Sequence, residues 1–171
     1  AENSHSNRAM IMGKQQPLGL ATYVQVLKEE RPSIIHFHEI AGGRGIGIYH
    51  LQAVKALGIK PLLTCHLSTY SCLTGNLVYK DQRLCDGIIR IKECTACAYH
   101  ARGIDGTKLL VLQGASKLLF ATGINTSEWN STLGTALGFP FIVEQKKKDL
   151  LNQSMLFDKI VVLTRWYQQI L

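Results

Sequence analysis

The sequence predicts an α/β fold built on a Rossmann-like parallel sheet with flanking helices. Two short apolar segments, residues 34–38 and 61–65, are separated by a stretch with helical periodicity. A strand–helix–strand order of this kind is typical of a parallel βαβ unit. A third apolar segment, residues 157–163, follows a long helical region near the C-terminus. Together these observations predict one sheet whose strands run in the same direction.

Length and composition narrow the class of protein. The chain has 171 residues, of which 46% are hydrophobic and 18% charged, so it is long enough for one folded domain and too apolar for a disordered protein. No apolar run approaches the length that spans a bilayer. The net charge of +7 favours phosphate-bearing partners, but the one dense basic run, residues 146–148, falls on a helical pattern and is interpreted as a solvated face. Because no stripe rich in arginine and aromatic residues is present, nucleic acid is not expected as a partner.

The two ends of the sequence differ from those of a typical complete domain. Residues 1–8 are polar, without an initiator Met or a signal-peptide core, and residues 1–19 are expected to be poorly ordered or derived from a tag. The last residues begin a helical pattern and stop without a cap or breaker. We therefore expect a fragment of a longer protein, with one domain over residues 20–171.

The first half of the domain shows clear element boundaries. Apolar residues at helical spacing predict a helix over residues 20–27, and Pro32 marks its end. Residues 34–38 predict a short strand of the kind buried in parallel sheets. A second helix is predicted over residues 48–57, with Gly58 as its C-cap.

The second half begins with residues 61–65, the next predicted strand. Residues 67–102 show little periodicity and are predicted to form a long loop. Beyond the loop, Thr164 is a good N-cap for a terminal helix that begins at Arg165. Between this loop and Thr164, the sequence predicts three helices and one strand. The helices cover residues 108–121, 128–137 and 143–155, and the strand covers residues 157–163.

Four of the five cysteines lie in the predicted loop. They are Cys72, Cys85, Cys94 and Cys97. The Cys-x2-Cys pair is a common half-site for structural zinc. However, twelve residues separate Cys72 from Cys85, which is outside the usual finger spacing, and His100 is an alternative ligand. Zinc, a pair of disulfides and reduced thiols all remain open.

Other roles for the cysteines fit less well. Cys65 falls within a predicted strand and is interpreted as a small buried hydrophobe. A thioredoxin-type redox pair would place Cys-x2-Cys at a strand-to-helix junction, whereas this pair lies deep in a loop.

Three histidines lie in or next to the first two predicted strands. Alternation places His36 and His38 on one face, and His36 is interpreted as a core residue. His38 and His66 follow the ends of neighbouring strands, where open α/β sheets place their ligand sites. An imidazole can act there as base, donor or ligand, and Glu39 is a candidate partner to fix its tautomer.

A glycine-rich turn follows the first strand and precedes a helix. Its residues include Gly42, Gly43 and Arg44, and its free amides, with the helix N-terminus, can bind an anion. It fits neither the dinucleotide fingerprint nor the phosphate-loop lysine motif, which disfavours a Rossmann-type redox enzyme. A simple chain reversal explains the same glycines equally well.

Several of these motifs resemble retaining glycosyltransferases of family four. Residues 32–38 resemble the P-D-[IV]-[IV]-H-x-H strand of that family, and residues 57–66 resemble its G-[IK]-P-[VL]-[VL]-x-T-x-H segment. The cysteine spacing resembles an insertion that many bacterial members carry. Residues 158–164 resemble the last strand before such enzymes cross to their second domain. The resemblance therefore covers about residues 32–171.

The resemblance implies a fold, a reaction and partners. The fold would be one incomplete half of the two-Rossmann GT-B fold, on the side that binds the acceptor. The reaction moves a sugar from a nucleotide-sugar to a glycan or lipid-linked acceptor, as in cell-envelope or polysaccharide synthesis. The resemblance also favours a cytoplasmic location, with peripheral contact to the inner face of the membrane. Missing N-terminal strands would leave an exposed sheet edge, which predicts a homodimer through strand pairing.

The same resemblance suggests roles for individual residues. His66 falls at the position of the cleft histidine and is the candidate catalytic residue, as donor or orienter. The acceptor or the donor phosphate would be bound by His38, Glu39, Gly42, Gly43 and Arg44. The cysteines Cys72, Cys85, Cys94 and Cys97 would hold a structural metal and shape the acceptor pocket.

Departures from the family pattern qualify the expected activity. Leu67 stands where members often carry Asp, and the donor-side Glu-x7-Glu pair does not occur in the chain, so the chain alone is expected to be inactive. The alternative from another functional class is a zinc-stabilised interaction module without catalysis.

Overall fold

The computed structural model describes residues 15–40, 45–129 and 131–170. The chain divides into two compact units, which are described one at a time. The first unit takes residues up to 66 together with 152–164, and the second takes 67–151 together with the residues from 165 on. The predicted start at residues 1–19 lies mostly outside the described residues.

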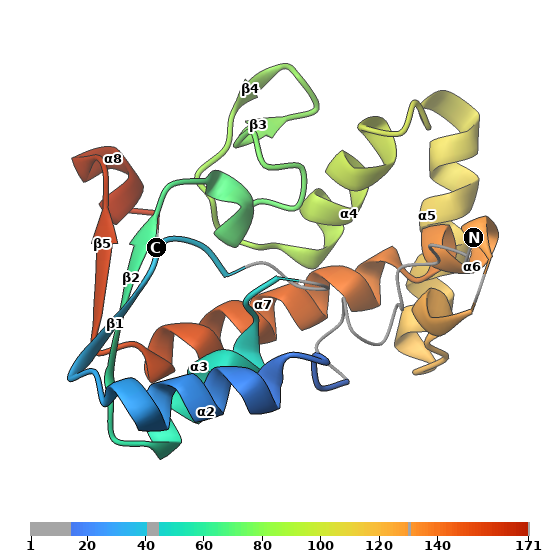
Figure 1. Ribbon diagram of the computed structural model, residues 1–171. Coiled ribbons are helices and arrows are strands. Elements are labelled where there is room, and N and C mark those ends of the chain that lie inside the picture. The colour runs from blue at the N-terminus through green and yellow to red at the C-terminus, as the bar shows by residue number, and fades with distance from the viewer. Residues whose placement is uncertain (1–14, 41–44, 130, 171) are drawn as a thin grey trace, which may run out of the picture. The chain divides into compact units, whose positions relative to one another are not determined.

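The first unit contains a three-stranded parallel sheet (Figure 1). Its strands are β1 (Ile34–Phe37), β2 (Lys60–Cys65) and β5 (Lys159–Val162), in the order β1-β2-β5. β2 pairs in parallel with both neighbours, with Phe37 opposite Leu63 in β1–β2. The prediction of an α/β fold with a parallel sheet is therefore confirmed.

Two helices of this unit pack side by side (Figure 1). Helix α2 (Leu20–Glu30) ends at Arg31, whose left-handed φ of 47° stops the helix just before Pro32. Helix α3 (Ile48–Ala56) is followed by Gly58, which has a φ of 72° and reverses the chain towards β2. Both helices and the two breakers match the sequence prediction.

The two faces of the sheet differ in burial. One face carries Phe37, Leu63 and Cys65, all at least 95% buried. The other face leaves Ile34 51% and Val161 41% exposed. The expectation that residues 34–38 are buried on both faces is therefore wrong, because within the described part of the chain only one face is well covered.

The second unit contains the segment that was predicted to be a long loop. After the short turn η1 (Ser68–Tyr70), a hairpin of β3 (Val78–Tyr79) and β4 (Arg83–Leu84) leads to helix α4 (Ile91–His100). The hairpin turn is made by Lys80 and Asp81, both with left-handed φ, at 49° and 57°. The prediction of a structureless loop is wrong for this part of the chain.

Helices make up the rest of the second unit. They are α5 (Gly106–Ala121), the turn η2 (Thr126–Glu128), α6 (Thr132–Leu137), α7 (Phe139–Leu156), which ends in the first unit, and α8 (Arg165–Gln168). The predicted helix 108–121 is confirmed, whereas the helix predicted over 128–137 is divided between η2 and α6. Helix α7 begins earlier than predicted, because Pro140 is in its first turn, where its missing N–H costs nothing.

Tyr99 of α4 is central to the core of this unit. It is 0% exposed, and its ring meets the Phe139 ring edge-on with 5.3 Å between centroids. The Tyr99 hydroxyl lies 2.9 Å from the Ala136 carbonyl oxygen and 3.0 Å from Ser116 Oγ. These contacts anchor α4 on α5, α6 and α7. Within the described residues, no helix is long and apolar enough to cross a bilayer.

Candidate functional site

Two imidazoles meet at the carboxyl edge of the parallel sheet. Because β1 and β2 run in the same direction, their C-terminal ends are neighbours, and His38 and His66 directly follow them. Nδ1 of His38 lies 3.1 Å from Nε2 of His66, and the two rings stack with 16° between their planes. The structure thus brings together the two histidines that sequence reasoning placed in one site.

A third imidazole extends this group. His36 is exposed, its ring centroid lies 4.3 Å from that of His38, and its Nε2 lies 2.7 Å from Thr64 Oγ1. The interpretation of His36 as a core residue is wrong, because it stands on the less covered face of the sheet. Sequence reasoning missed Thr64, although alternation along paired strands places it on the same face as His36.

The His38–His66 contact has a defined chemistry. Of the two facing nitrogens, one must donate a proton and the other must accept it, whichever tautomers are present. The other nitrogen of each ring, Nε2 of His38 and Nδ1 of His66, is then left as one acceptor and one donor. If the pair takes up one further proton, it presents two donors and one shared positive charge. Such a pair can bind a sugar hydroxyl in the first state and a phosphate oxygen in the second.

The remaining predicted residues of this edge are placed differently. Glu39 is half-buried, and the hydrogen bond of His38 goes to His66 and not to Glu39. Burial and the Glu39 charge raise the pKa of the Cys65 thiol to about 11, and this thiol is 2% exposed, as expected for a small buried hydrophobe. The predicted anion-binding residues Gly42, Gly43 and Arg44 lie outside the described residues.

In the second unit, the four cysteines of the cysteine-rich segment gather. Cys94 and Cys97 lie three residues apart on α4, Cys85 directly follows β4, and Cys72 follows η1. Burial raises the pKa of Cys94, and the nearby thiols of Cys85, Cys72 and Cys97 raise it further. All four are half-buried free thiols. Residues from three different elements therefore place their sulfurs within electrostatic reach of one another.

The loop after Cys72 places hydrogen-bonding groups around its sulfur. Sγ lies 3.2 Å from Thr74 Oγ1, and the backbone amides of Leu77, Thr74 and Gly75 also hydrogen-bond to it. Burial alone would raise the pKa of Cys72, but these hydrogen bonds outweigh it and lower the pKa below its usual 9.0. An arrangement of this kind stabilises a thiolate, which is the form that binds a metal.

Lys146 of α7 is directed at the same segment. Its Nζ donates a hydrogen bond to the carbonyl oxygen of Thr69, and burial lowers its pKa, against the opposing effect of Cys72, Asp149 and Cys94. The interpretation of residues 146–148 as a solvated face holds for Lys147 and Lys148, which are exposed, but is wrong for Lys146.

The chemistry of these donors fits zinc, since four thiolates are one of the usual ligand sets of a structural site. The side chains as they stand are not closed around one point. Over residues 15–40, 45–129 and 131–170, no group of three or more His, Cys, Asp or Glu side chains is arranged to hold a metal ion. Zinc binding would therefore require the four thiols to turn inward from their present positions.

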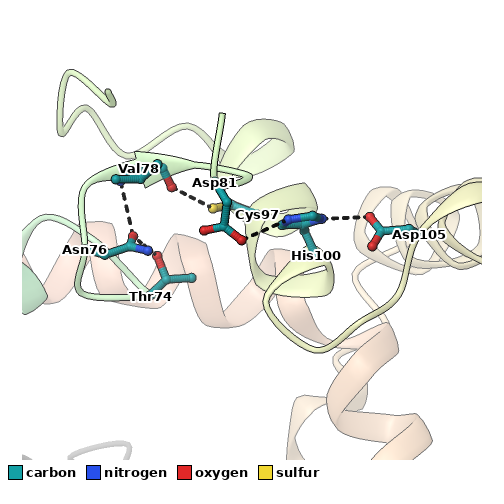
Figure 2. Close-up of polar contacts among 7 residues, drawn as sticks. All are labelled: Thr74, Asn76, Val78, Asp81, Cys97, His100 and Asp105. Carbon is teal, nitrogen blue, oxygen red and sulfur yellow. Dashed lines mark hydrogen bonds and ion pairs between the residues drawn. The ribbon is translucent and has the colours of Figure 1, made fainter. Parts of the chain in front are cut away.

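His100, an alternative zinc ligand in the sequence analysis, makes contacts of another kind. Its ring lies between two carboxylates (Figure 2): Nδ1 is 2.8 Å from Asp105 Oδ1 and Nε2 is 3.2 Å from Asp81 Oδ2. One turn earlier, the Cys97 thiol donates to the Val78 carbonyl oxygen at 3.6 Å. Since both ring nitrogens are engaged, His100 joins the hairpin to α4 and to the start of α5. Sequence reasoning missed both aspartates because they are distant from one another in the chain.

We expect His100 to make the stability of the second unit depend on pH. The hydrogen bond and charge of Asp105, with a smaller contribution from Asp81, raise the pKa of His100 above 6.5. A raised pKa in the folded state contributes stability that is fully present below the unfolded value and is lost as pH rises through the folded value. The urea midpoint should fall as pH rises above about 6.5, and His100→Gln should remove most of that fall. An equal fall in the variant would contradict this role.

Comparisons with protein-family models, curated proteins and solved structures find no match to this chain.

Proposed function

We propose that this chain is the acceptor-side domain of a retaining glycosyltransferase with two Rossmann-like domains. The observation that carries the proposal is the 3.1 Å contact between His38 and His66 at the carboxyl edge of a parallel sheet. This edge is where α/β sheets bind their ligands, and both histidines belong to the strand motifs that resemble the family. A nucleotide-sugar is the donor substrate, and a glycan or a lipid-linked glycan is the acceptor.

In this proposal the imidazole pair acts on the reacting sugar and its phosphate. His66 lies next to the reacting sugar as a hydrogen-bond donor or orienter, and His38 holds its tautomer through the shared proton. Sugar transfer develops negative charge on the leaving nucleoside diphosphate, and preorganised donors stabilise it. A singly protonated pair supplies two such donors. Most of the remaining groups would come from a donor-side domain, so this chain alone is proposed to bind ligand without turnover.

Histidine-detected NMR of the 171-residue chain tests this proposal. UDP-, GDP- and dTDP-hexoses and candidate acceptor glycans are added in turn while the ring signals of His38 and His66 are followed. We expect both signals to shift with at least one ligand, and His66→Ala to weaken binding about 10-fold, as for one lost charge-assisted hydrogen bond. The control His100→Gln removes an imidazole elsewhere and should bind normally.

Two results would count against the proposal. One is the absence of any shift at His38 or His66 with every nucleotide-sugar and glycan tested. The other is an equal loss of binding in His66→Ala and His100→Gln, which would show that the sheet edge is not the site. Sugar transfer by the chain itself would contradict the expectation that it is inactive alone.

A second proposal concerns the cysteines: Cys72, Cys85, Cys94 and Cys97 hold one structural zinc ion. It is supported by the electrostatic coupling of the four thiols and by the donors directed at the Cys72 sulfur. This zinc would be compatible with a glycosyltransferase and also with the alternative of a non-catalytic interaction module. The two are distinguished by the histidine signals, because a module of that kind would bind zinc and show no response to sugar ligands.

A further inference from the structure

The first turn of helix α3, in the first unit, is capped by a histidine side chain. Gly47 is the N-cap and His50 is the third residue of the helix. The backbone N–H of Gly47 donates to Nδ1 of His50 at 3.1 Å, and the backbone N–H of His50 donates to the Gly47 carbonyl oxygen at 3.1 Å. In an ordinary capping box, the side chain that accepts from the N-cap amide belongs to Glu or Gln. In this helix an imidazole takes that place.

The hydrogen bond to Gly47 requires one protonation state of the ring. Nδ1 of His50 accepts only when it carries no proton, so the ring is neutral and its proton is on Nε2. A protonated imidazole has an N–H at both nitrogens and cannot accept. Its positive charge would also lie at a helix N-terminus, where the helix dipole disfavours cations. This cap is therefore lost on protonation, whereas a glutamine cap would not be.

The surroundings of His50 do not favour its cation. The side chain is buried, with 6% exposed, and its ring meets the Tyr23 ring of α2 edge-on with 5.0 Å between centroids. Burial raises the pKa of Tyr23 above its usual 10.0, so the phenol is neutral. Burial also lowers the pKa of His50 below 6.5, against a smaller opposing effect of the Gly47 backbone. No charged group among the described residues contributes to that shift.

The other titratable groups on the elements around His50 are distant, paired or neutral. Helices α2 and α3 pack together, and α3 also packs on β2. Lys55 of α3 is paired with Asp158 at 2.7 Å, and the Cys65 thiol of β2, with a pKa of about 11, stays protonated. The remaining titratable residues are Lys28, Glu29 and Glu30 of α2, more than one turn beyond Tyr23, Tyr49 of α3, and the exposed Lys60 at the start of β2.

We propose that His50 makes the first turn of α3 an acid-sensitive switch, which is closed while the imidazole is neutral and opens when the ring is protonated. Opening would also disturb Leu51, which is fully buried and donates its N–H to the same Gly47 carbonyl oxygen at 3.3 Å. Because α3 connects the parallel strands β1 and β2, it begins at the carboxyl edge of the sheet, the edge that carries His38 and His66. The switch does not depend on the proposed sugar transfer.

The direction of the pH dependence follows from the lowered pKa of His50. A histidine whose pKa is lower in the folded than in the unfolded state contributes stability that is fully present above the unfolded value of about 6.5. That contribution is lost as pH falls through the folded value. His100 in the second unit acts in the opposite direction, because its pKa is raised. The two effects can therefore be separated by a readout at α3.

NMR of the full 171-residue chain from about pH 8 to about pH 5 tests this proposal. At the upper end, Nδ1 of His50 should show the ¹⁵N shift of an unprotonated acceptor, and the Gly47 amide should be protected from exchange. After correction for intrinsic exchange, that protection should fall about 5-fold at the lower end, as for one lost helix cap. His50→Gln keeps an acceptor that does not titrate, so its protection should change less than about 2-fold over the same range.

Two further variants complete the design. His50→Ala lacks the acceptor and should show low protection of Gly47 at every pH, while His100→Gln removes an imidazole of the other unit and should keep the acid-dependent loss. Urea unfolding checks that each variant is folded. A Gly47 amide that stays equally protected in acid in the unchanged chain would overturn the proposal. So would an equal acid-dependent loss in His50→Gln, or a neutral His50 ring with its proton on Nδ1.

Discussion

Replacement of Cys94 by serine, or treatment with a strong zinc chelator, is expected to unfold the cysteine-rich part of the second unit. Cys72 follows η1, Cys85 follows the hairpin, and Cys94 and Cys97 lie on α4, so one ion would join three parts of this segment. Structural zinc contributes on the order of 10–16 kcal/mol of apparent binding free energy, as much as the whole stability of an ordinary domain. The measurements are elemental analysis, which should give one zinc per chain, and circular dichroism before and after chelation.

Cys65→Ala is the matched control for this prediction. Cys65 is also a cysteine, but it is buried in β2 of the first unit and its pKa of about 11 keeps it protonated. This variant should retain one zinc and the same response to the chelator. In the unchanged chain, which has five cysteines, a count of free thiols separates the alternatives. No zinc and one free thiol would indicate two disulfides, and no zinc with five free thiols would indicate inert reduced cysteines. Either result would exclude the zinc proposal.

The first unit could be predicted from the sequence because local signals and tertiary structure agree there. The strands near residues 34–38 and 61–65 are short apolar segments between strong breakers. Pro32 directly follows Arg31, whose φ is left-handed, and Gly58 has a φ of 72°. Both residues therefore break the helices at the positions expected from their backbone chemistry. Parallel pairing then places the ends of β1 and β2 together, so that the meeting of His38 and His66 follows from sequence position.

The segment from 67 to 102 could not be predicted because its order comes from tertiary contacts. The buried residues of helix α4 are small or end in a hydroxyl group, so the apolar periodicity of the helix is weak. They are Thr95, Ala96, Ala98 and Tyr99. The hairpin strands have only two residues each, and their turn uses Lys80 and Asp81 at left-handed φ where glycine or asparagine would be expected. The bonds of His100 to Asp81 and Asp105 then hold these pieces, and neither aspartate belongs to a recognisable motif.

The same limit applies to the residues around the sites. Whether His36 is a core residue or a surface residue depends on which face of the sheet is covered, and a short apolar strand does not reveal this. Lys146 is indistinguishable from Lys147 and Lys148 in sequence, yet it alone hydrogen-bonds to Thr69 and lies near the cysteines. Motifs thus indicate which residue types gather at a site, while burial and charge environment are set by packing.

Gly138→Ala is expected to destabilise the second unit by about 3 kcal/mol, at the upper end of the range for overpacked cores. Gly138 ends α6, and a Cβ at this position would lie 2.3 Å from the backbone nitrogen of Ser127 and 2.5 Å from its Cα. Ser127 is 1% exposed and belongs to the η2 turn, whose Thr126 hydroxyl donates to the Gly134 carbonyl oxygen at 2.9 Å. Because the clash is with backbone, no side-chain rotation can relieve it. Urea unfolding followed by tryptophan fluorescence measures the loss.

Gly114→Ala provides the control with the same chemical change in the same unit. Gly114 lies within helix α5, and a Cβ there would meet nothing within 4 Å. Alanine has the higher helix propensity, so this variant should be more stable by about 0.5–1 kcal/mol. The two substitutions should therefore shift the urea midpoint in opposite directions. A midpoint for Gly138→Ala at or above that of the unchanged chain would show that η2 and α6 do not approach one another as closely as described.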